Sequence, residues 1–246
     1  MRPILCLLVT LVALHCTAQV PTQGLVAYFP FDNNTQDNSE YHNNGTITGG
    51  IQTTTDRNGN ACGAMAFDGK TGYVSVPNNS SIQAIRSGFT VATWFKLDVP
   101  TANEARVVLF SKDSTDAIGK AKPGFHVTYL QNFNEAMGQL SFCNGYAEED
   151  KTYGQHRLAY NEWYHLALVY DDGWLNLYLN GKRIWQAMHN QAIEKNDFAL
   201  EIGRNLWPQA NYFKGSYDEY RLYNRGLNAT EVLALYNYTP PLADGN

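Results

Sequence analysis

Short segments of alternating apolar and polar residues recur along almost the whole chain, and they limit the fold more than any other feature. In residues 89–97, Phe89, Val91 and Phe95 share one side while Trp94 points to the other, as in a half-buried strand. About a dozen such segments with no helices between them exclude a parallel α/β fold and favour an antiparallel sandwich. The predicted strands are residues 24–31, 46–48, 64–67, 73–76, 89–97, 106–111, 125–130, 139–142, 163–170, 174–180, 183–187, 198–202 and 212–223.

Polar turns join these segments. Asp171-Asp172-Gly173 and Asn180-Gly181 stand between apolar runs, and Asn-Gly is a strong signal for a two-residue hairpin. One helix is expected near the C-terminus, because Asn228 and Glu231 have the spacing of a capping box and Pro240-Pro241 follow. We expect that helix to cover the sandwich.

Residues 1–18 have the pattern of a secretory signal peptide. Arg2 precedes an apolar run over residues 4–14 that is too short to span a bilayer, and Cys16-Thr17-Ala18 resembles a cleavage site. This predicts cleavage after Ala18 and an exported domain over residues 19–246, secreted or at the cell surface. A lipoprotein with Cys16 lipidated is the alternative, although the bulky His15 before it argues against that reading.

Charge and cysteine content bear on the partners and on a possible disulfide. The formal net charge is −5 and no run of Lys or Arg occurs, which argues against nucleic acid and anionic membranes as partners. After the signal peptide, Cys62 and Cys143 are the two remaining cysteines. An exported protein can keep one disulfide between them, or they can be two separate thiols.

Four segments together resemble the LamG-like jelly-roll family, which is related to laminin-G domains, pentraxins and concanavalin A-like lectins. The most specific is EWYHLALVYDDGWLNLYLNGKRI at 162–184; the others are LVAYFPFDNNTQDNSEYHNNGTITG, FDGKTGYVSVPNNSSI and FKGSYDEYRLYNRGLNATEVLALY. The resemblance implies an all-β, two-sheet antiparallel jelly roll with one short C-terminal helix. It does not choose a function, because this fold hosts lectins, hydrolases, lyases and adhesion modules.

Catalytic patterns are weak. Jelly-roll glycosidases carry acids at alternate positions of one strand, and the chain contains no E-x-D-x-E. Glu148 and Asp150 fall in a stretch that reads as a loop, and Asp218 and Glu219 are neighbours expected on opposite faces of a strand. We therefore expect a non-catalytic protein, with a glycoside hydrolase or lyase as a minor alternative.

Calcium is the cofactor that the sequence favours. Residues 32–44 are crowded with Asp, Asn and Ser oxygens, which calcium prefers, although such side chains also bond their own turns. The resemblance to the LamG-like family implies Asp32, Asp68 and Asp218 as ligands.

Aromatic residues mark candidate ligand contacts. Trp207 lies in a segment without strand periodicity between Arg204 and Tyr212, where a rim loop could offer a flat apolar face with polar neighbours to a sugar. Weaker candidates are Trp174 at a hairpin tip, and Tyr153 and His156 in the predicted loop before Glu162.

These features favour a secreted, lectin-like protein whose partner is an extracellular glycan. The alternative is an extracellular adhesion or matrix module of the laminin-G type with a protein partner.

Overall fold

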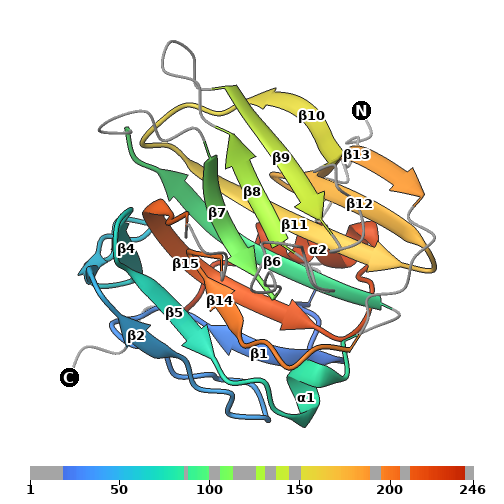
Figure 1. Ribbon diagram of the computed structural model, residues 1–246, viewed down its shortest axis with the longest axis horizontal. Coiled ribbons are helices and arrows are strands. Elements are labelled where there is room, and N and C mark those ends of the chain that lie inside the picture. The colour runs from blue at the N-terminus through green and yellow to red at the C-terminus, as the bar shows by residue number, and fades with distance from the viewer. Residues whose placement is uncertain are drawn as a thin grey trace, which may run out of the picture.

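Two antiparallel sheets packed face to face form the molecule (Figure 1). The structure is a computed structural model that describes residues 19–85, 88–99, 106–112, 126–130, 137–143, 151–188, 195–205 and 211–241. The all-β sandwich predicted from the spacing of the strands is confirmed.

The larger sheet contains eight strands, one of which, β1, pairs only with β15. In order across the sheet they are β13 (Lys182–Met188), β12 (Trp174–Leu179), β11 (Trp163–Asp171), β6 (Gly88–Leu97), β15 (Lys214–Tyr223), β4 (Ala64–Asp68) and β3 (Ile51–Thr54), with β1 (Leu25–Phe29) on β15.

The smaller sheet contains seven strands. Their order is β10 (Lys151–Arg157), β9 (Met137–Cys143), β8 (His126–Leu130), β7 (Arg106–Ser111), β14 (Leu200–Ile202), β5 (Tyr73–Val76) and β2 (Thr46–Thr48).

Alternation along the strands builds the core between the sheets. In β6, Phe89, Val91 and Phe95 are almost fully buried in that core, while Trp94 points to the outer face of the larger sheet, as predicted. In β14, Leu200 and Ile202 enter the same core. Each sheet therefore has one inner apolar face and one outer face, and outer-face residues of the smaller sheet such as Ser111 and Glu201 are also buried.

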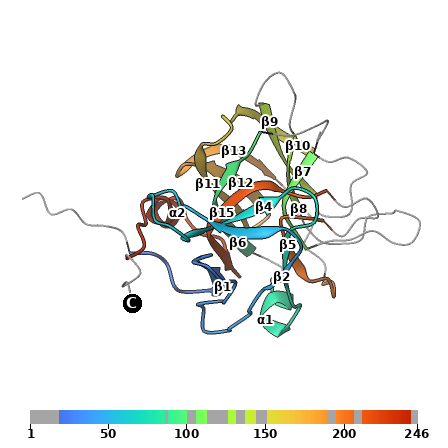
Figure 2. The ribbon, with the colours of Figure 1, turned by 90° about the vertical axis from the view of Figure 1, so that its left-hand side faces the viewer.

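Helix α2 (Ala229–Tyr236) covers part of the outer face of the larger sheet (Figure 2). Asn228 and Glu231 form the predicted capping box. Val232 and Leu235 pack in a second apolar cluster with strand residues such as Ala167. A second helix, α1 (Ser80–Gln83), is one turn long and was not predicted.

Both predicted hairpin turns are present. Asp172, Gly173, Asn180 and Gly181 all have positive φ, between 45° and 77°, as a two-residue hairpin turn requires. Strand β10 was missed, since the sequence there had been read as a loop, and β3 was missed as well.

Candidate functional site

Polar residues form a row across the outer face of the smaller sheet. Direct pairing places Ser75 beside Glu201, Glu201 beside Ser111, and Ser111 beside His126. The row lies on the outer face because the residues next to it in sequence, such as Ile202, point into the core. Four strands therefore bring polar side chains together that are far apart in sequence.

Arg204, a predicted ligand contact, lies beside the middle of this row. Its Nε donates a hydrogen bond to Oε2 of Glu201 over 2.9 Å, and its guanidinium lies 3.3 Å from the centre of the Tyr73 ring. No described residue pairs with its two terminal nitrogens, and the side chain is 20% exposed. The guanidinium is thus held on an aromatic ring, and no described residue accepts a hydrogen bond from its terminal N–H groups.

Gly203 sets the position of Arg204. Its φ is +89°, and a Cβ there would lie 2.8 Å from the Phe67 ring, so glycine suits both the backbone and the space. Its N–H donates to the Leu109 carbonyl, and its own carbonyl accepts from Phe213. The chain is anchored on both sides directly before Arg204.

Tyr212, also predicted, lies beside Arg204 because the two residues form an isolated antiparallel bridge. The Asn205 side chain links the same two segments, because its Oδ1 accepts a hydrogen bond from the Asn211 N–H over 2.9 Å. The Nδ2 atom of Asn205 is buried without a hydrogen-bond partner. Trp207, the main predicted contact, lies between these anchored ends but outside the described residues.

Glu201 is held in place by two donors. Besides Arg204, the Ser75 hydroxyl donates to its Oε1 over 2.8 Å, and the residue is 2% exposed. Glu201 is also the single acidic residue in the described strands of the smaller sheet. These strands therefore do not supply the pair of carboxylates that glycoside hydrolysis requires.

Of the remaining predicted contacts, Trp174 is described and lies apart from this site. Trp174 lies on the outer face of the larger sheet, on the opposite side of the sandwich. Tyr153 and His156 were expected in a loop but belong to β10, which pairs with β9 along its whole length. Their side chains lie outside the described residues, as do Glu148 and Asp150.

The three predicted calcium ligands differ in their surroundings in the structure. Asp68 accepts hydrogen bonds from Thr71 and from the backbone N–H groups of residues 70–72. Although burial opposes the change, these bonds lower its pKa well below the usual range. Asp218 instead forms an ion pair with Arg57, and Asp32 is exposed. Among the described residues no three acidic, His or Cys side chains could hold a metal ion.

Hydrogen bonds within the Asn-rich segment involve one of its carboxylates, that of Asp37. Asp37 is 2% exposed, and its carboxylate accepts from the backbone N–H groups of Tyr28, Ser39 and Asn43 and from the Ser39 hydroxyl. The alternative reading of these side chains as turn-formers therefore accounts for this carboxylate. Calcium binding stays a prediction.

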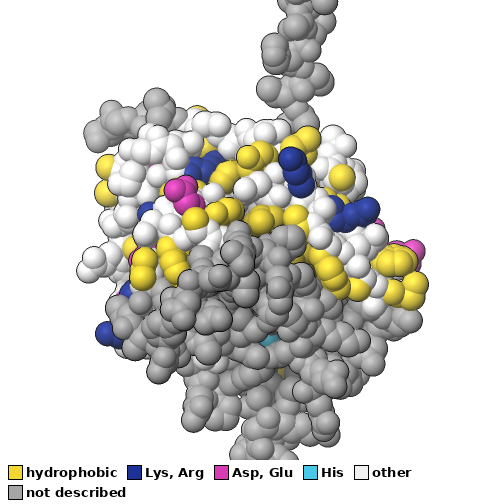
Figure 3. Space-filling view, turned by 90° about the horizontal axis from the view of Figure 1, so that it is seen from above, with side chains coloured by type: hydrophobic (Ala, Val, Ile, Leu, Met, Phe, Trp, Pro, Cys, Tyr) yellow, Lys and Arg dark blue, Asp and Glu magenta, His cyan; other side chains and the backbone are white. Residues whose placement is uncertain are grey.

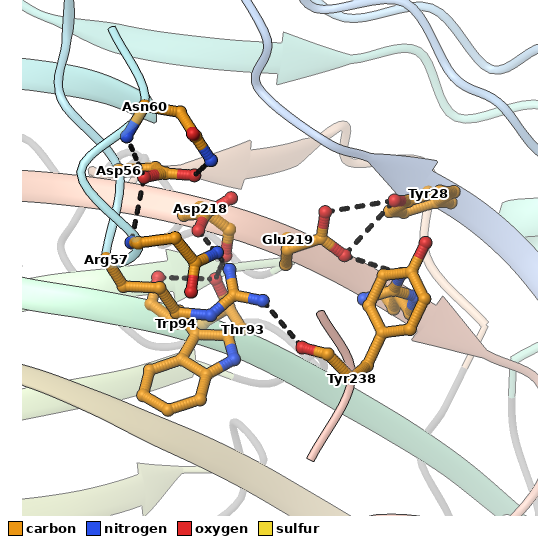
Figure 4. Close-up of polar contacts among 11 residues, drawn as sticks. Tyr28, Asp56, Arg57, Asn60, Thr93, Trp94, Asp218, Glu219 and Tyr238 are labelled. Atoms are coloured by element: carbon orange, nitrogen blue, oxygen red, sulfur yellow. Dashed lines mark hydrogen bonds and ion pairs between the residues drawn. The ribbon is translucent and has the colours of Figure 1, made fainter. Parts of the chain in front are cut away.

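Asp218 and Glu219 lie on the same outer face of the larger sheet, against the prediction of opposite faces (Figure 4). The reason is a bulge: Glu219 has φ +58° and the register with β6 shifts between Asp218 and Arg221. Burial raises the pKa of Asp218 to about 8, against the lowering effect of Arg57. Both carboxylates are nearly fully buried, so no substrate can reach them.

The C-terminal segment closes over these two acids. Arg57 contacts Asp218 and also donates to the Tyr238 carbonyl over 2.8 Å. Glu219 pairs with Arg221, whose guanidinium lies over the Tyr28 ring and over the Tyr238 ring. This cluster fastens the end of the chain to the sheet and is structural.

The disulfide that Cys62 and Cys143 could form is not present. Cys62 is a free, exposed cysteine between β3 and β4 of the larger sheet. Cys143 ends β9 in the smaller sheet. The two cysteines thus belong to different sheets.

A family model for the concanavalin A-like lectin/glucanases superfamily matches residues 68–233. The chain belongs to this superfamily. The LamG-like resemblance and the jelly-roll fold are thereby confirmed. No curated protein matches the sequence.

Solved structures share the fold at low sequence identity. Domain 4 of AbnA, a GH43 extracellular arabinanase from Geobacillus stearothermophilus, in complex with arabinotriose, is 21% identical with a TM-score of 0.63; the match covers 87% of this chain and 98% of that one. The binding domain of botulinum neurotoxin DC in complex with SialylT is 15% identical with a TM-score of 0.62, covering 88% and 52%. A Trypanosoma rangeli sialidase with the inhibitor DANA is 19% identical with a TM-score of 0.60, covering 90% and 34%.

The chain thus spans almost all of the arabinanase domain but about half of the toxin domain and a third of the sialidase chain. These neighbours include sugar-bound domains and an enzyme, so they do not determine whether this chain is catalytic. None of the described helices has the length and apolar character needed to cross a membrane.

Proposed function

We propose that this protein is a secreted, non-catalytic carbohydrate-binding domain that contacts glycans through the outer face of its smaller sheet. The observation that carries the proposal is the arrangement of Arg204, which lies flat on Tyr73 while Glu201 holds its Nε. Its free terminal nitrogens can donate to sugar hydroxyls, and the neighbouring rings of Tyr73 and Tyr212 offer apolar faces.

Two further observations support binding without catalysis. Within the described strands of this sheet Glu201 is the one acid, and it is buried and already paired. The acids of β15 are covered by the C-terminal segment. A hydrolase or lyase on this chain would therefore need residues outside these strands.

The surface and the neighbours agree with a glycan ligand. On the face seen in Figure 3, the described part carries scattered hydrophobic side chains and a few separate Lys, Arg and acidic side chains, without a broad region of one charge. The arabinanase domain was solved with arabinotriose and a toxin domain with SialylT. Export follows from the predicted signal peptide and is part of the proposal.

A protein partner is the second candidate function. It is favoured by one comparison, since the binding domain of botulinum neurotoxin DC was solved in complex with rat synaptotagmin II. An adhesion module would bind through a broad surface rather than through a few polar donors beside aromatic rings.

A glycan array probed with residues 19–246 tests the proposal. We expect binding to a defined group of glycans, and Arg204→Met should weaken it by about tenfold or more, because charged hydrogen bonds contribute about 1.5–3 kcal/mol each. Lys182→Met, which removes an exposed cation on the other sheet, is the matched control and should bind normally.

Absence of binding by folded wild-type protein would exclude the glycan proposal and favour the protein partner. Equal binding by Arg204→Met and wild type would place the glycan site elsewhere.

A further inference from the structure

The largest exposed aromatic side chain among the described residues, Trp174, lies far from the site just proposed. It is 40% exposed on the outer face of the larger sheet, and Met188 directly opposite it in β13 is 58% exposed. Asp171 of β11 stands opposite Trp174 on its other side. The indole thus has an exposed carboxylate on one flank and an exposed thioether on the other.

Polar side chains continue this patch one step along the strands. Asn176 and Gln186 are directly paired and lie on the same outer face, two residues beyond Trp174 and Met188. The Asn176 Oδ1 accepts a long hydrogen bond from Arg183 over 3.4 Å. Neighbouring strands are about 4.8 Å apart and alternate residues about 7 Å apart, so these polar groups surround the indole at the scale of one sugar ring.

The size of the patch favours a sugar over a protein as its ligand. Among the described residues its exposed apolar part consists of two side chains, which is much less than the roughly 800 Å² per partner of a stable protein interface. An indole face beside carboxylate and amide groups matches the apolar face and the hydroxyls of a sugar. Asp171 next to the ring opposes a carboxylated sugar by charge repulsion.

We propose that Trp174 is the centre of a second glycan site, which stacks one neutral sugar ring while Asp171, Asn176 and Gln186 contact its hydroxyls. This inference rests on the proposed glycan-binding function but concerns a different sheet. Two sites on opposite outer faces of the sandwich would bind two separate glycan chains, so one molecule could link glycans that are presented on different surfaces.

The test measures by calorimetric titration how many glycans one molecule of wild type, Trp174→Ala and Trp174→Phe binds, with neutral, sialylated and uronic-acid oligosaccharides as the probes. We expect each wild-type molecule to bind two neutral oligosaccharides and each Trp174→Ala molecule to bind one. Trp174→Phe should keep the second site, because phenylalanine retains a flat apolar face. Since Trp174 is partly exposed, both variants should melt like the wild type.

Independent evidence comes from tryptophan fluorescence. Neutral glycans from the array should protect wild-type protein from acrylamide quenching, and the protection should fall in Trp174→Phe. Equal binding stoichiometry in Trp174→Ala and wild type, or binding restricted to acidic glycans, would overturn the second site and leave the function at Arg204 standing. A wild type that binds no glycan would overturn both.

Discussion

His165 is a buried side chain whose protonation makes the stability of the fold depend on pH. It is 2% exposed on the outer face of the larger sheet, where its ring packs against Trp94 and Tyr236. Burial, together with Arg221 and Arg57, lowers its pKa to about 3. Because the unfolded chain takes up the proton near pH 6.5 and the folded protein does not, stability is present above pH 6.5 and is lost as the pH falls toward 3.

We predict that His165→Phe makes the protein less sensitive to acid. Phenylalanine keeps the aromatic packing and removes the titration, so the two proteins should have similar free energies of unfolding at pH 7.5. At pH 3 the histidine should cost the wild type on the order of 4 kcal/mol relative to the variant. Urea denaturation at several pH values measures this difference, and parallel pH profiles would contradict it.

The directions of single side chains show what strand alternation predicts correctly and where it fails. The outward direction of Trp94 follows from strict alternation along β6, and the structure confirms it. The same rule failed at Asp218 and Glu219, because a bulge adds a residue and turns both to one face. Nothing in the local sequence marks that bulge, since its backbone conformation depends on the paired strands.

Whole elements were predicted where local chemistry determines them. The start of α2 follows from the capping box, and the two hairpins follow from their turn residues. Strand β10 was missed because KTYGQHR is polar and lacks apolar alternation; it becomes a strand through its pairing with β9. Edge strands of this kind depend on their neighbour more than on their own residues.

Asn228→Ala should destabilise the protein by about 1 kcal/mol, because it removes the acceptor for the Glu231 N–H at the start of α2. For a chain of this size that corresponds to a melting temperature lower by about 2–4 °C. Asn228→Ser, which keeps a capping oxygen, is the control and should stay within about 1 °C of the wild type. Differential scanning calorimetry decides the point, and an unchanged melting temperature for the alanine variant would show that the packing of α2 alone fixes its start.

At the scale of the whole molecule, the fold and family could be read from the sequence, whereas the site could be read only in part. Arg204 and Tyr212 were predicted from their composition and position, but Tyr73, Ser75 and Glu201 were not. They come from β5 and β14, more than a hundred residues apart, and only strand pairing brings them together. Long-range contacts also join both ends of the chain, since β1 pairs with β15 and Tyr238 after α2 lies against Arg221 of β15.

The C-terminal segment packs against the larger sheet, and removing it should destabilise the protein. A chain that ends at Asn237 keeps α2 but loses the Tyr238 carbonyl, which accepts from Arg57, and the Tyr238 ring, which lies on Arg221. A hydrogen bond from a charged donor contributes about 1.5–3 kcal/mol and a cation–π contact about 0.5–2 kcal/mol. We therefore expect the free energy of unfolding to fall by about 3 kcal/mol in urea denaturation.

Tyr238→Phe in the full chain keeps both contacts and should match the wild type. If the shortened chain were as stable as the wild type, Arg57 and Arg221 would be held by their carboxylates alone, and the segment after α2 would contribute nothing to the fold.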